Sequence, residues 1–435
     1  MSSKLPDQSA GAAFSPAYRW YALSMLVIVY VFNFIDRSIL GILVEPIKTD
    51  LGVSDTLMGF LGGIVFALFY TVLGIPIARF ADSGSRRNVL AVCLALWSAA
   101  TAMCGLAQNF IQLALARVGV AVGEAGGSPP SHSMISDMFP PNQRATALAI
   151  YALGIPIGTM LGNLGGGWIN EAFDWRTAFM VVGLPGVALA VIVRLTLREP
   201  PRGLSDGIVD ATAAPPPVKA VFKYLWSLRS FRLVALGAAT HAFVGYGAGY
   251  WIAAMFARSH GYTTGEMGTA LFYLGFAGIA GTFLGGYLSD RLGRNDQRWY
   301  TWLPALAILG TIPFGALSYL HGDPEIALLA MIVPNILGGF FLGPSFAVTQ
   351  GLVGLRMRAL AASIFLFVLN LIGLGLGPQI AGVISDVLNN TTTLGSDSLR
   401  WSLTICLVFN LLSATLYFLA SRTLRADLTR SRESG

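Results

Sequence analysis

The chain has 435 residues, of which 54% are hydrophobic and only 11% are charged, with a formal net charge of +6. Soluble domains contain about 25% charged residues, so this composition excludes an ordinary soluble domain and indicates a polytopic membrane protein. The basic residues are scattered over short loops, so membrane topology explains the positive charge better than nucleic-acid binding does. The three cysteines lie in apolar stretches without a C-x-x-C spacing, which is typical of packing residues and not of a disulfide or metal site.

Apolar stretches separated by charged or Pro/Gly/Asn turns predict about twelve membrane-spanning helices, because about 20 apolar residues cross the hydrocarbon core. The polar start of the chain lacks the pattern of a cleavable signal peptide. The predicted spans of the first half cover residues 18–47, 55–81, 86–107, 109–138, 143–170 and 176–197. Those of the second half cover residues 230–257, 263–289, 298–320, 325–349, 356–387 and 399–421. We therefore expect an all-α membrane protein.

A polar, Pro-rich segment divides the predicted spans into two groups of six. We expect an N-terminal six-helix bundle over residues 1–197, a cytoplasmic linker over 198–229 and a C-terminal six-helix bundle over 230–435. Residues 219–228 place apolar side chains on one helical face beside two lysines, which predicts a basic amphipathic helix lying on the anionic cytoplasmic leaflet. A solvated linker is the alternative interpretation of this segment.

The basic residues are distributed unequally between the two sides of the membrane. Most of the 28 Lys and Arg residues fall in loops on the side of both termini, and the other side has only Lys48, Arg176, Arg258 and Arg400. Cytoplasmic loops carry the excess of basic residues, so both termini are predicted to lie in the cytoplasm. We expect a multi-pass protein of a bacterial inner (plasma) membrane.

Four charged residues lie deep inside predicted spans of the first half, away from the span ends: Asp36 and Arg37 in "NFIDRSIL", and Arg117 and Glu124 in "RVGVAVGEA". A charge at the bilayer centre costs at least about 2.5–3.5 kcal/mol on insertion scales, so such residues are functional candidates by default. Adjacent helical residues do not face one another, so Asp36 and Arg37 need separate partners. Arg117 and Glu124 lie two helical turns apart and share one face.

The predicted depths of these helices pair Asp36 with Arg117, direct Arg37 to another face and leave Glu124 without an obvious neighbour. A carboxylate that exchanges an arginine for a proton as hydration changes is what proton coupling requires. We therefore assign proton coupling to Asp36, Arg37, Arg117 and Glu124. A static salt-bridge cluster that only fixes the packing is the alternative.

The second half has no acid or base deep in its predicted spans. Its candidate cavity residues are polar but uncharged: His241, Tyr246, Tyr250, Asn335, Asn370 and Gln379. Among them, Tyr246, Asn335 and Asn370, together with Arg37, are candidate substrate-binding residues. The first half thus supplies charged side chains, and the second half supplies mostly apolar side chains with a few uncharged polar ones. This distribution suits an amphipathic substrate with a charged head and an apolar tail.

Small residues recur every fourth position in two spans, at Gly154, Gly158, Gly162 and Gly166, and at Gly373 and Gly377. This spacing predicts close helix packing.

The two halves also carry related loops. "ARFADSGSRRN" (78–88) follows the second predicted span, and "GGYLSDRLGRN" (285–295) follows the eighth. Two related halves of six spans are a transporter plan, with the site near the midplane. The sequence "GYLSDRLGR" resembles the G-x-L-x-D-R-x-G-R signature of the major facilitator superfamily. "NFIDR", "RVGVAVGEA" and "YALGIPIGTMLG" resemble its Spinster-like branch, which is associated with lysophospholipids and sphingoid lipids.

This resemblance implies twelve helices in two pseudo-symmetric six-helix bundles and a gating role for the loop residues. The gating candidates are Asp82, Arg86, Arg87, Gly286, Asp290, Arg291, Gly293 and Arg294. Ala78, Ser83 and Ser85 replace two glycines and an arginine of the signature in the first-half copy. We therefore expect Asp290 to contribute more to closure than Asp82.

The chain contains no H-E-x-x-H, G-x-S-x-G or Walker pattern, so we expect neither an enzyme nor an ATP-driven pump. The predicted function is proton-coupled secondary transport, by alternating access, of an amphipathic lipid-like substrate of the lysophospholipid or sphingoid type. A proton symporter of small organic anions is the alternative, and a substrate-sensing receptor is a further one. We expect no cofactor besides the coupling proton, membrane lipids as partners, no nucleic acid, and a functional monomer.

Overall fold

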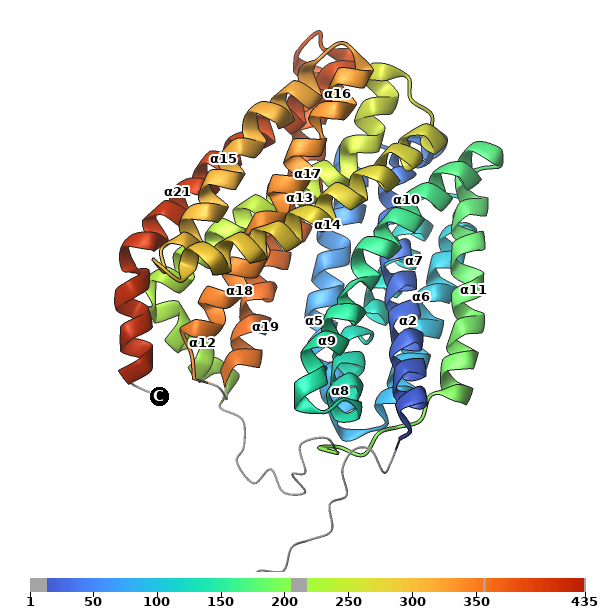
Figure 1. Ribbon diagram of the computed structural model, residues 1–435. Coiled ribbons are helices and arrows are strands. Elements are labelled where there is room, and N and C mark those ends of the chain that lie inside the picture. Colours follow the sequence, from blue (N-terminus) through green and yellow to red (C-terminus); the bar gives the residue numbers. More distant parts are fainter. Residues whose placement is uncertain (1–13, 205–216, 355–356, 434–435) are drawn as a thin grey trace, which may run out of the picture. The chain divides into compact units, whose positions relative to one another are not determined.

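The computed structural model describes residues 14–204, 217–354 and 357–433. In these ranges the chain is built from helices and contains no strand (Figure 1). The helices of the first half are α2 (Pro16–Ile42), α3 (Val44–Leu51), α4 (Asp55–Phe60), the π-helix η1 (Leu61–Val65), α5 (Phe66–Ser83), α6 (Arg86–Cys104), α7 (Phe110–Glu124), α8 (Ser128–Met138), α9 (Pro141–Ala152), α10 (Gly154–Ala172) and α11 (Trp175–Thr196).

The second half begins with a short helix and continues with long ones. Its helices are α12 (Val218–Ser227), α13 (Arg229–His260), α14 (Thr264–Gly293), α15 (Trp299–Leu320), α16 (Pro324–Ala330), α17 (Ile332–Gly338), the 3₁₀ helix η2 (Gly339–Phe341), α18 (Leu342–Gly351), α19 (Arg358–Leu369), the π-helix η4 (Asn370–Leu374), α20 (Gly375–Thr391), the 3₁₀ helix η5 (Gly395–Asp397) and α21 (Ser398–Glu433).

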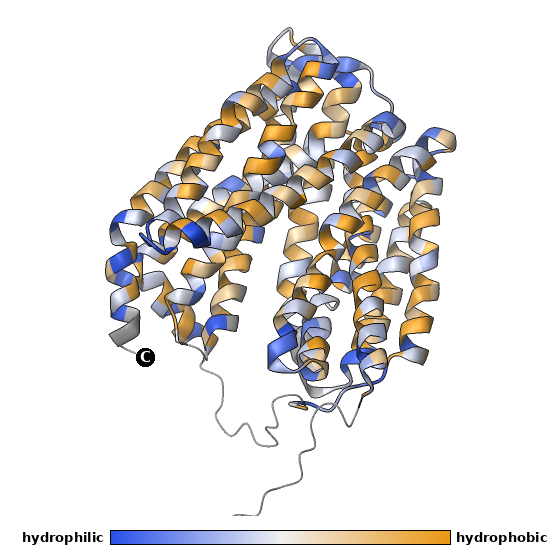
Figure 2. Ribbon diagram, viewed as in Figure 1, coloured by the Kyte–Doolittle hydropathy of each residue, from blue (hydrophilic) through white to orange (hydrophobic). Residues whose placement is uncertain are grey.

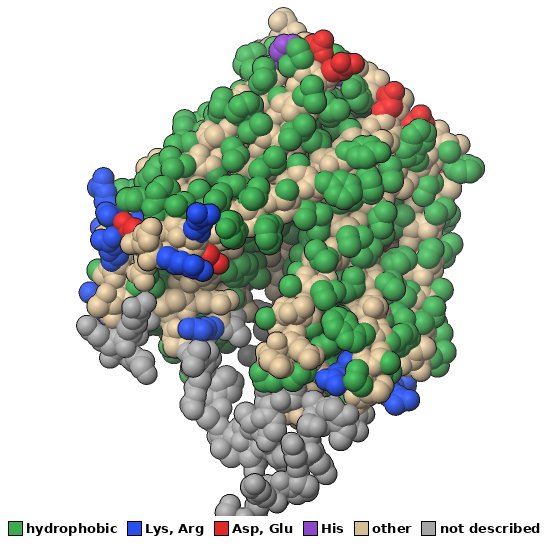
Figure 3. Space-filling view, in the orientation of Figure 1, with side chains coloured by type: hydrophobic (Ala, Val, Ile, Leu, Met, Phe, Trp, Pro, Cys, Tyr) green, Lys and Arg blue, Asp and Glu red, His purple; other side chains and the backbone are tan. Residues whose placement is uncertain are grey.

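Hydrophobic residues dominate most of these helices, and hydrophilic residues gather near their ends (Figure 2). Within the described residues, 11 helical stretches are long and apolar enough to cross a membrane, and the 32-residue helix α13 occupies the position of the remaining predicted span. Acidic side chains lie near α16, whereas Lys and Arg side chains lie near α12 and the C-terminus (Figure 3). The predicted all-α membrane fold is confirmed.

The chain forms two compact units. Unit 1 contains residues 1–39, 69–162 and 173–214, and unit 2 contains residues 40–68, 163–172 and 215–435. Unit 2 therefore combines the second half of the chain with the end of α2, all of α3, α4 and η1, the start of α5 and the end of α10. The predicted division at residues 197 and 230 follows the sequence alone and stays a prediction.

In unit 1, glycines let α10 pack closely against α2. A Cβ atom added to Gly158 would clash with the Val31 carbonyl oxygen, and one added to Gly162 would clash with Ser38 Oγ. In unit 2, a Cβ atom on Gly377 would lie 2.5 Å from the backbone oxygen of Phe243 on α13. These contacts confirm the predicted close packing, and they hold the segment of α2 that carries "NFIDR" against a rigid neighbour.

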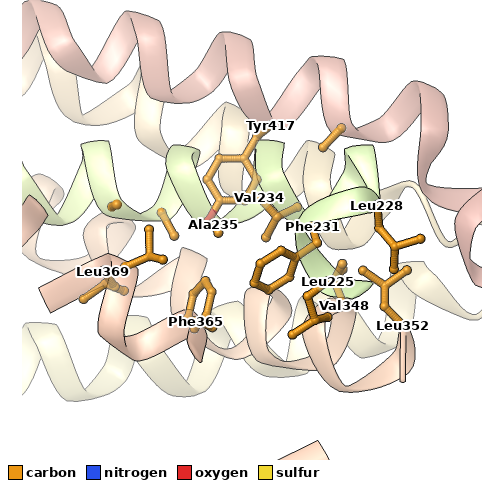
Figure 4. Close-up of a cluster of buried hydrophobic side chains, with 14 of the residues drawn as sticks. Leu225, Leu228, Phe231, Val234, Ala235, Val348, Leu352, Phe365, Leu369 and Tyr417 are labelled. Atoms are coloured by element: carbon orange, nitrogen blue, oxygen red, sulfur yellow. The ribbon is translucent and has the colours of Figure 1, made fainter. Parts of the chain in front are cut away.

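The amphipathic helix predicted in the linker is α12, but its apolar face is not available to a membrane. Leu225 is fully buried, and Figure 4 shows it with Leu228, Phe231 and Val348 in the hydrophobic core of unit 2. We expected this face to lie on the leaflet. It instead covers helices α13, α18 and α19, because burial against the protein satisfies the same apolar side chains. Phe222, on the opposite edge, is 41% exposed.

Helix α21 continues to Glu433, well beyond the predicted end at 421. The reason is that its last turns have tertiary partners. Leu424 is fully buried, and the Asp427 carboxylate accepts hydrogen bonds from the Ser230 backbone N–H (3.0 Å) and hydroxyl (2.7 Å). Asp427 thereby caps the first turn of α13, whose N–H groups lack partners within the helix.

Two π-helical segments of unit 2 lie at a close approach between backbones. A Cβ atom on Gly59 would lie 2.5 Å from the Pro378 carbonyl oxygen, and one on Gly63 would lie 2.6 Å from the Gly375 carbonyl oxygen. Because only glycine fits there, α4 and η1 pack directly on η4 and α20. Short π-helical segments are frequent at functional sites.

Candidate functional site

The four charged residues predicted to couple protons form one buried cluster in unit 1. Helix α2 carries Asp36 and Arg37, and α7 carries Arg117 and Glu124. Asp36 is 0% exposed, Arg117 2% and Glu124 1%. The packing of α10 on α2 fixes one side of the cluster. On the other side, a close approach of Gly123 to the backbone of α6 fixes α7.

Arg37 and Glu124 form the ion pair of this cluster. The Nε atom of Arg37 donates a hydrogen bond to Glu124 Oε2 over 2.5 Å. The Arg37 guanidinium also lies over the rings of Phe34, at 5.0 Å, and Tyr70, at 4.6 Å. Asn33, one turn before Arg37 on α2, interacts with the Glu124 carboxylate. Glu124 is therefore paired through Oε2, whereas its buried Oε1 atom accepts no hydrogen bond from the described residues.

Arg117 contacts Asp36 through the backbone and not through the carboxylate. Its Nη1 atom donates to the Asp36 carbonyl oxygen over 3.2 Å. Within the described residues, neither carboxylate oxygen of Asp36 accepts a hydrogen bond. The predicted pairing of Asp36 with Arg117, with Arg37 directed elsewhere and Glu124 without a neighbour, is thus wrong. The long Arg37 side chain reaches Glu124, and Asp36 is the acid that lacks a donor.

This geometry favours a proton on Asp36. An ionised carboxylate that is fully buried without a hydrogen-bond donor is strongly disfavoured. Protonation removes that charge without breaking any hydrogen bond in the cluster. From α6, Thr101 and Cys104 face Asp36, and Cys104 is also within electrostatic range of Arg117. The cluster can therefore hold a proton at Asp36 while Arg37 and Glu124 remain paired.

A second group of ion pairs in unit 1 is centred on Arg86, one of the gating candidates. The Arg86 side chain is 1% exposed and contacts the Asp137 carboxylate through Nη1. Nη1 also donates to Ser133 Oγ (2.8 Å), Nε donates to Glu199 Oε1 (2.8 Å), and Nη2 donates to the Pro200 carbonyl oxygen (2.5 Å). Arg86 thus ties the start of α6 to the end of α8 and to the chain after α11.

Glu199 is held by several donors at once. Its carboxylate accepts hydrogen bonds from the Arg86 side chain, from the Arg87 backbone N–H (2.9 Å) and from the Ser85 hydroxyl (2.8 Å). Burial alone would raise the pKa of Glu199, but these donors outweigh burial and hold the pKa below its usual value. The side chain of Asp82 lies outside the described part of the structure.

The corresponding loop of unit 2 is more open. Asp290 Oδ1 accepts a hydrogen bond from the Tyr300 hydroxyl over 3.0 Å, and Gly293 lies against the Tyr300 ring, where a Cβ atom would approach within 2.5 Å. The remaining gating candidates of this loop, Gly286, Arg291 and Arg294, are half-buried or exposed. Although its signature is complete, this copy has fewer ion pairs among the described residues than the degenerate copy around Arg86 has.

A neighbouring acid, Asp296, connects this loop to α21. It forms ion pairs with Arg298 (2.9 Å) and Arg425 (2.8 Å). Hydrogen bonds from the Arg298 side chain and backbone, and from Arg425, hold the pKa of Asp296 well below its usual value.

The candidate substrate-binding residues of the second half all belong to unit 2. Tyr246 on α13 is 41% exposed. Asn335 on α17 is half-buried and donates to the Met331 carbonyl oxygen over 2.9 Å, and Asn370 begins the π-helix η4. The related candidate His241 is buried and bonds Asn410 over 2.9 Å, which indicates a packing role.

A network of ion pairs in unit 2 is centred on Asp55, at the start of α4. The Asp55 carboxylate pairs with Lys48 Nζ (2.7 Å) and with both terminal nitrogens of Arg258 on α13 (2.7 and 2.8 Å). It also accepts a hydrogen bond from the Ser385 hydroxyl on α20 (2.6 Å). The Asp386 carboxylate, next along α20, accepts from the backbone N–H groups of residues 55 and 56. We refer to these contacts as the Asp55 network.

The family model described as Major Facilitator Superfamily matches residues 26–378. The chain belongs to the major facilitator superfamily. It is 35% identical over 418 aligned residues to an MFS-type efflux pump of Mycolicibacterium smegmatis, covering 95% of each chain. It is 27% identical to human protein spinster homolog 1, covering 99% of this chain and 86% of that protein.

A solved structure supports the same assignment for this major facilitator protein. It is similar, with a TM-score of 0.87 and 33% identity, to a bacterial homolog of the human lysosomal transporter Spinster, crystallised in an inward-facing and unoccupied conformation. The alignment covers 95% of this chain and 99% of that one. The fold and the relatives are those of transporters, and the predicted twelve-helix fold and Spinster resemblance are confirmed.

Several polar residues of this transporter were missed by the sequence analysis. Glu199 follows the sixth predicted span, where an acid in a loop is typical of a solvated residue, and Asp137 lies at the polar end of the fourth predicted span. Lys48 and Arg258 carried a usable signal, because they are two of the few basic residues on their side of the membrane. Asp55 carried another, because it follows the helix-capping residue Ser54. Nothing in the sequence indicated that these groups would meet.

Replacing Arg86 by Ala in this major facilitator protein is expected to lower the free energy of unfolding by about 3 kcal/mol, because breaking a buried ion pair leaves its partner uncompensated. Arg86→Lys is expected to recover only part, since an ammonium group cannot serve both acids in a planar fork. The measurement is thermal or denaturant unfolding in detergent. Arg87→Ala is the control, and an equal loss in that variant would contradict the central position of Arg86.

Proposed function

We propose that this chain is a proton-coupled secondary active transporter of an amphipathic, lipid-like molecule of the lysophospholipid or sphingoid type, working by alternating access. The single observation that carries the proton coupling is the fully buried Asp36 carboxylate, which has no hydrogen-bond donor beside an ion pair of Arg37 and Glu124. An acid in this position gains a proton easily when the cluster is dry and loses it when water or a cation approaches.

The substrate class is supported by the distribution of polar groups. The charges within the spans of the first half are concentrated in the Asp36 cluster, whereas the candidate residues of the second half are uncharged. The relatives include spinster proteins and an efflux pump, and the association of the Spinster-like branch with lysophospholipids and sphingoid lipids supports the lipid-like class. Arg37 or Arg117 could equally hold a small carboxylate, so a proton symporter of small organic anions is the second candidate.

The proposed orientation places both termini in the cytoplasm of a bacterial inner membrane. The excess of basic residues near α12 and the C-terminus supports this orientation (Figure 3). The proposed driving force is sufficient in size, since a membrane potential supplies about 2.3 kcal/mol per charge per 100 mV. That corresponds to roughly fifty-fold accumulation for one coupled charge.

The test is transport by the purified chain in proteoliposomes under an imposed pH gradient. A fluorescent lysophospholipid or sphingoid base is expected to move, to acidify or alkalise the lumen as it does so, and to be displaced by unlabelled lysolipid better than by a sugar acid of equal charge. If only small anions move, the symporter of organic anions replaces this proposal. Binding without any movement of substrate would instead indicate a receptor.

A further inference from the structure

Helix α6 presents a buried hydroxyl group to the Asp36 carboxylate. Thr101 is 0% exposed and faces Asp36, which is also 0% exposed. Within the described residues, Thr101 Oγ1 and both Asp36 carboxylate oxygens lack a hydrogen-bond partner. The large majority of buried polar groups are hydrogen-bonded. A donor and an acceptor that face each other, both without a partner, therefore call for an explanation.

Thr101, like Thr349 on α18, lacks a hydrogen bond that many helical threonines of this chain make. A threonine within a helix commonly donates its hydroxyl to the carbonyl oxygen one turn earlier. Thr240 does so to Leu236 (2.7 Å), and Thr404 does so to Arg400 (2.8 Å). Thr101 does not make this bond. Its hydroxyl is therefore available to turn toward a neighbouring side chain.

We propose that Thr101 is a positioning residue for the coupling proton: its hydroxyl donates to Asp36 when that carboxylate is ionised and releases it when Asp36 takes up a proton. This inference rests on the proposed proton coupling. In the structure the Thr101 side chain faces the Asp36 carboxylate. Rotation of one hydroxyl would supply the donor that the ionised carboxylate lacks.

The other groups around Asp36 are charged or are weak donors. From α7, Arg117 is a cation whose Nη1 atom donates to the Asp36 backbone carbonyl, and Glu124 is an acid of the same sign as Asp36. On the helix of Asp36 itself, Arg37 is paired with Glu124. Cys104, also on α6, offers only a thiol, which is a weak donor. Among the described neighbours of Asp36, Thr101 is the uncharged oxygen donor.

The sign of the effect follows from which form the hydroxyl stabilises. A donor stabilises the ionised carboxylate, so its removal favours the protonated form. In Thr101→Val, which keeps the shape of the side chain, the pH midpoint of proton-driven transport should move upwards. A hydrogen bond to a charged group is strong enough for a shift of about one pH unit, a tenfold change in proton concentration. Thr101→Ser keeps the hydroxyl and should restore the wild-type midpoint.

The experiment measures transport rate against pH in proteoliposomes for the wild type, Thr101→Val, Thr101→Ser and Asp36→Asn. Ser98→Ala is the matched control, since it removes another buried hydroxyl of α6 whose oxygen lacks a partner and lies against Gly186 on α11. We expect the pH midpoint to move upwards in Thr101→Val and to stay at the wild-type value in Thr101→Ser and Ser98→Ala. Transport by Asp36→Asn should not respond to pH. Thr101→Ala gives a second hydroxyl-free variant if Thr101→Val folds poorly.

Three outcomes would contradict either the role of Thr101 or the proposed function on which it rests. A wild-type midpoint in both Thr101→Val and Thr101→Ala, with a flat profile for Asp36→Asn, would overturn the role of Thr101 and leave the proposed function standing. An equal shift in Ser98→Ala would also overturn it, because the effect would then come from packing of α6. A wild-type pH response in Asp36→Asn would overturn the proposed proton coupling itself.

Discussion

Asp36→Asn and Glu124→Gln are each expected to abolish accumulation driven by a pH gradient while leaving the chain folded. The two changes act differently. Asn at 36 imitates the protonated acid and needs no new partner, so the site stays in one protonation state. Gln at 124 removes the negative charge that Arg37 contacts over 2.5 Å and leaves that cation without its acid. Both variants therefore lose the exchange of a proton for an ion pair.

The measurement is substrate accumulation in proteoliposomes with and without a pH gradient, beside exchange across membranes at equal pH. Exchange is expected to continue in Asp36→Asn, because it needs no net proton movement. Asp174→Asn is the control: Asp174 caps α11 at an exposed position, and Asn preserves a cap. If both cluster variants kept gradient-driven accumulation, the four charges would be a static element of packing.

Substitutions of Arg117 and Arg37 test proton coupling less directly than substitutions of the two acids do. Arg117→Ala leaves buried acids uncompensated, at a cost of about 3–5 kcal/mol, so lost transport could reflect lost folding. The pairing of Arg37 with Glu124 has a similar effect. Arg37→Ala would disturb the proton site and any substrate contact together, and so cannot separate the two roles. The acids, whose amide analogues keep their shape, are the better probes.

Asp55→Asn is expected to weaken the contact between the start of α4 and the end of α13, at one end of unit 2. The equilibrium between the made and the broken contact should shift towards the broken contact by more than tenfold. The carboxamide still fits beside Ser385 but cannot neutralise Lys48 and Arg258, which both pair with the acid. Removing one partner from a buried ion pair costs about 3–5 kcal/mol. Partial exposure of Lys48 reduces this effect, which still exceeds the 1.4 kcal/mol that corresponds to tenfold.

The measurement is the distance distribution between spin labels at the start of α4 and the end of α13, both within unit 2. A longer or broader distribution of distances is expected for Asp55→Asn. Transport should also slow if formation of the contact between α4 and α13 limits the rate of the transport cycle. Asp50→Asn, an exposed acid on the preceding helix, is the control. An unchanged distribution in Asp55→Asn would mean that the glycine contacts of Gly59 and Gly63 with α20 hold this end without the Asp55 network.

The sequence was sufficient to predict the spans and the members of the charged cluster. Hydropathy is a one-dimensional property, and Asp36 or Glu124 inside an apolar stretch is conspicuous without any structure. The sequence could not predict which of these residues form ion pairs, because the length of the Arg37 side chain and the rotation of α2 about its axis decide which acid Arg37 contacts. The face of α12 was misjudged for a similar reason: the apolar residue Leu225 packs equally well against lipid or protein.

The Asp55 network could not be predicted from the sequence, because its members are far apart along the chain. Its members lie at positions 48, 55, 258, 385 and 386, and only tertiary contacts bring them together. No local spacing connects them. The end of α21 was missed likewise, since Asp427 lies in a polar stretch whose helix is stabilised by its contact with Ser230.

The position of Cys104 provides a chemical reporter inside the transporter. This thiol is fully buried, beside Asp36 and Arg117, whereas Cys93 and Cys406 are buried elsewhere. A small water-soluble alkylating reagent can reach Cys104 only when solvent enters the space around Asp36 and Arg117. The alkylation rate of Cys104, with the other two thiols as internal references, therefore counts hydration events at the cluster in the unmodified chain, with no label introduced.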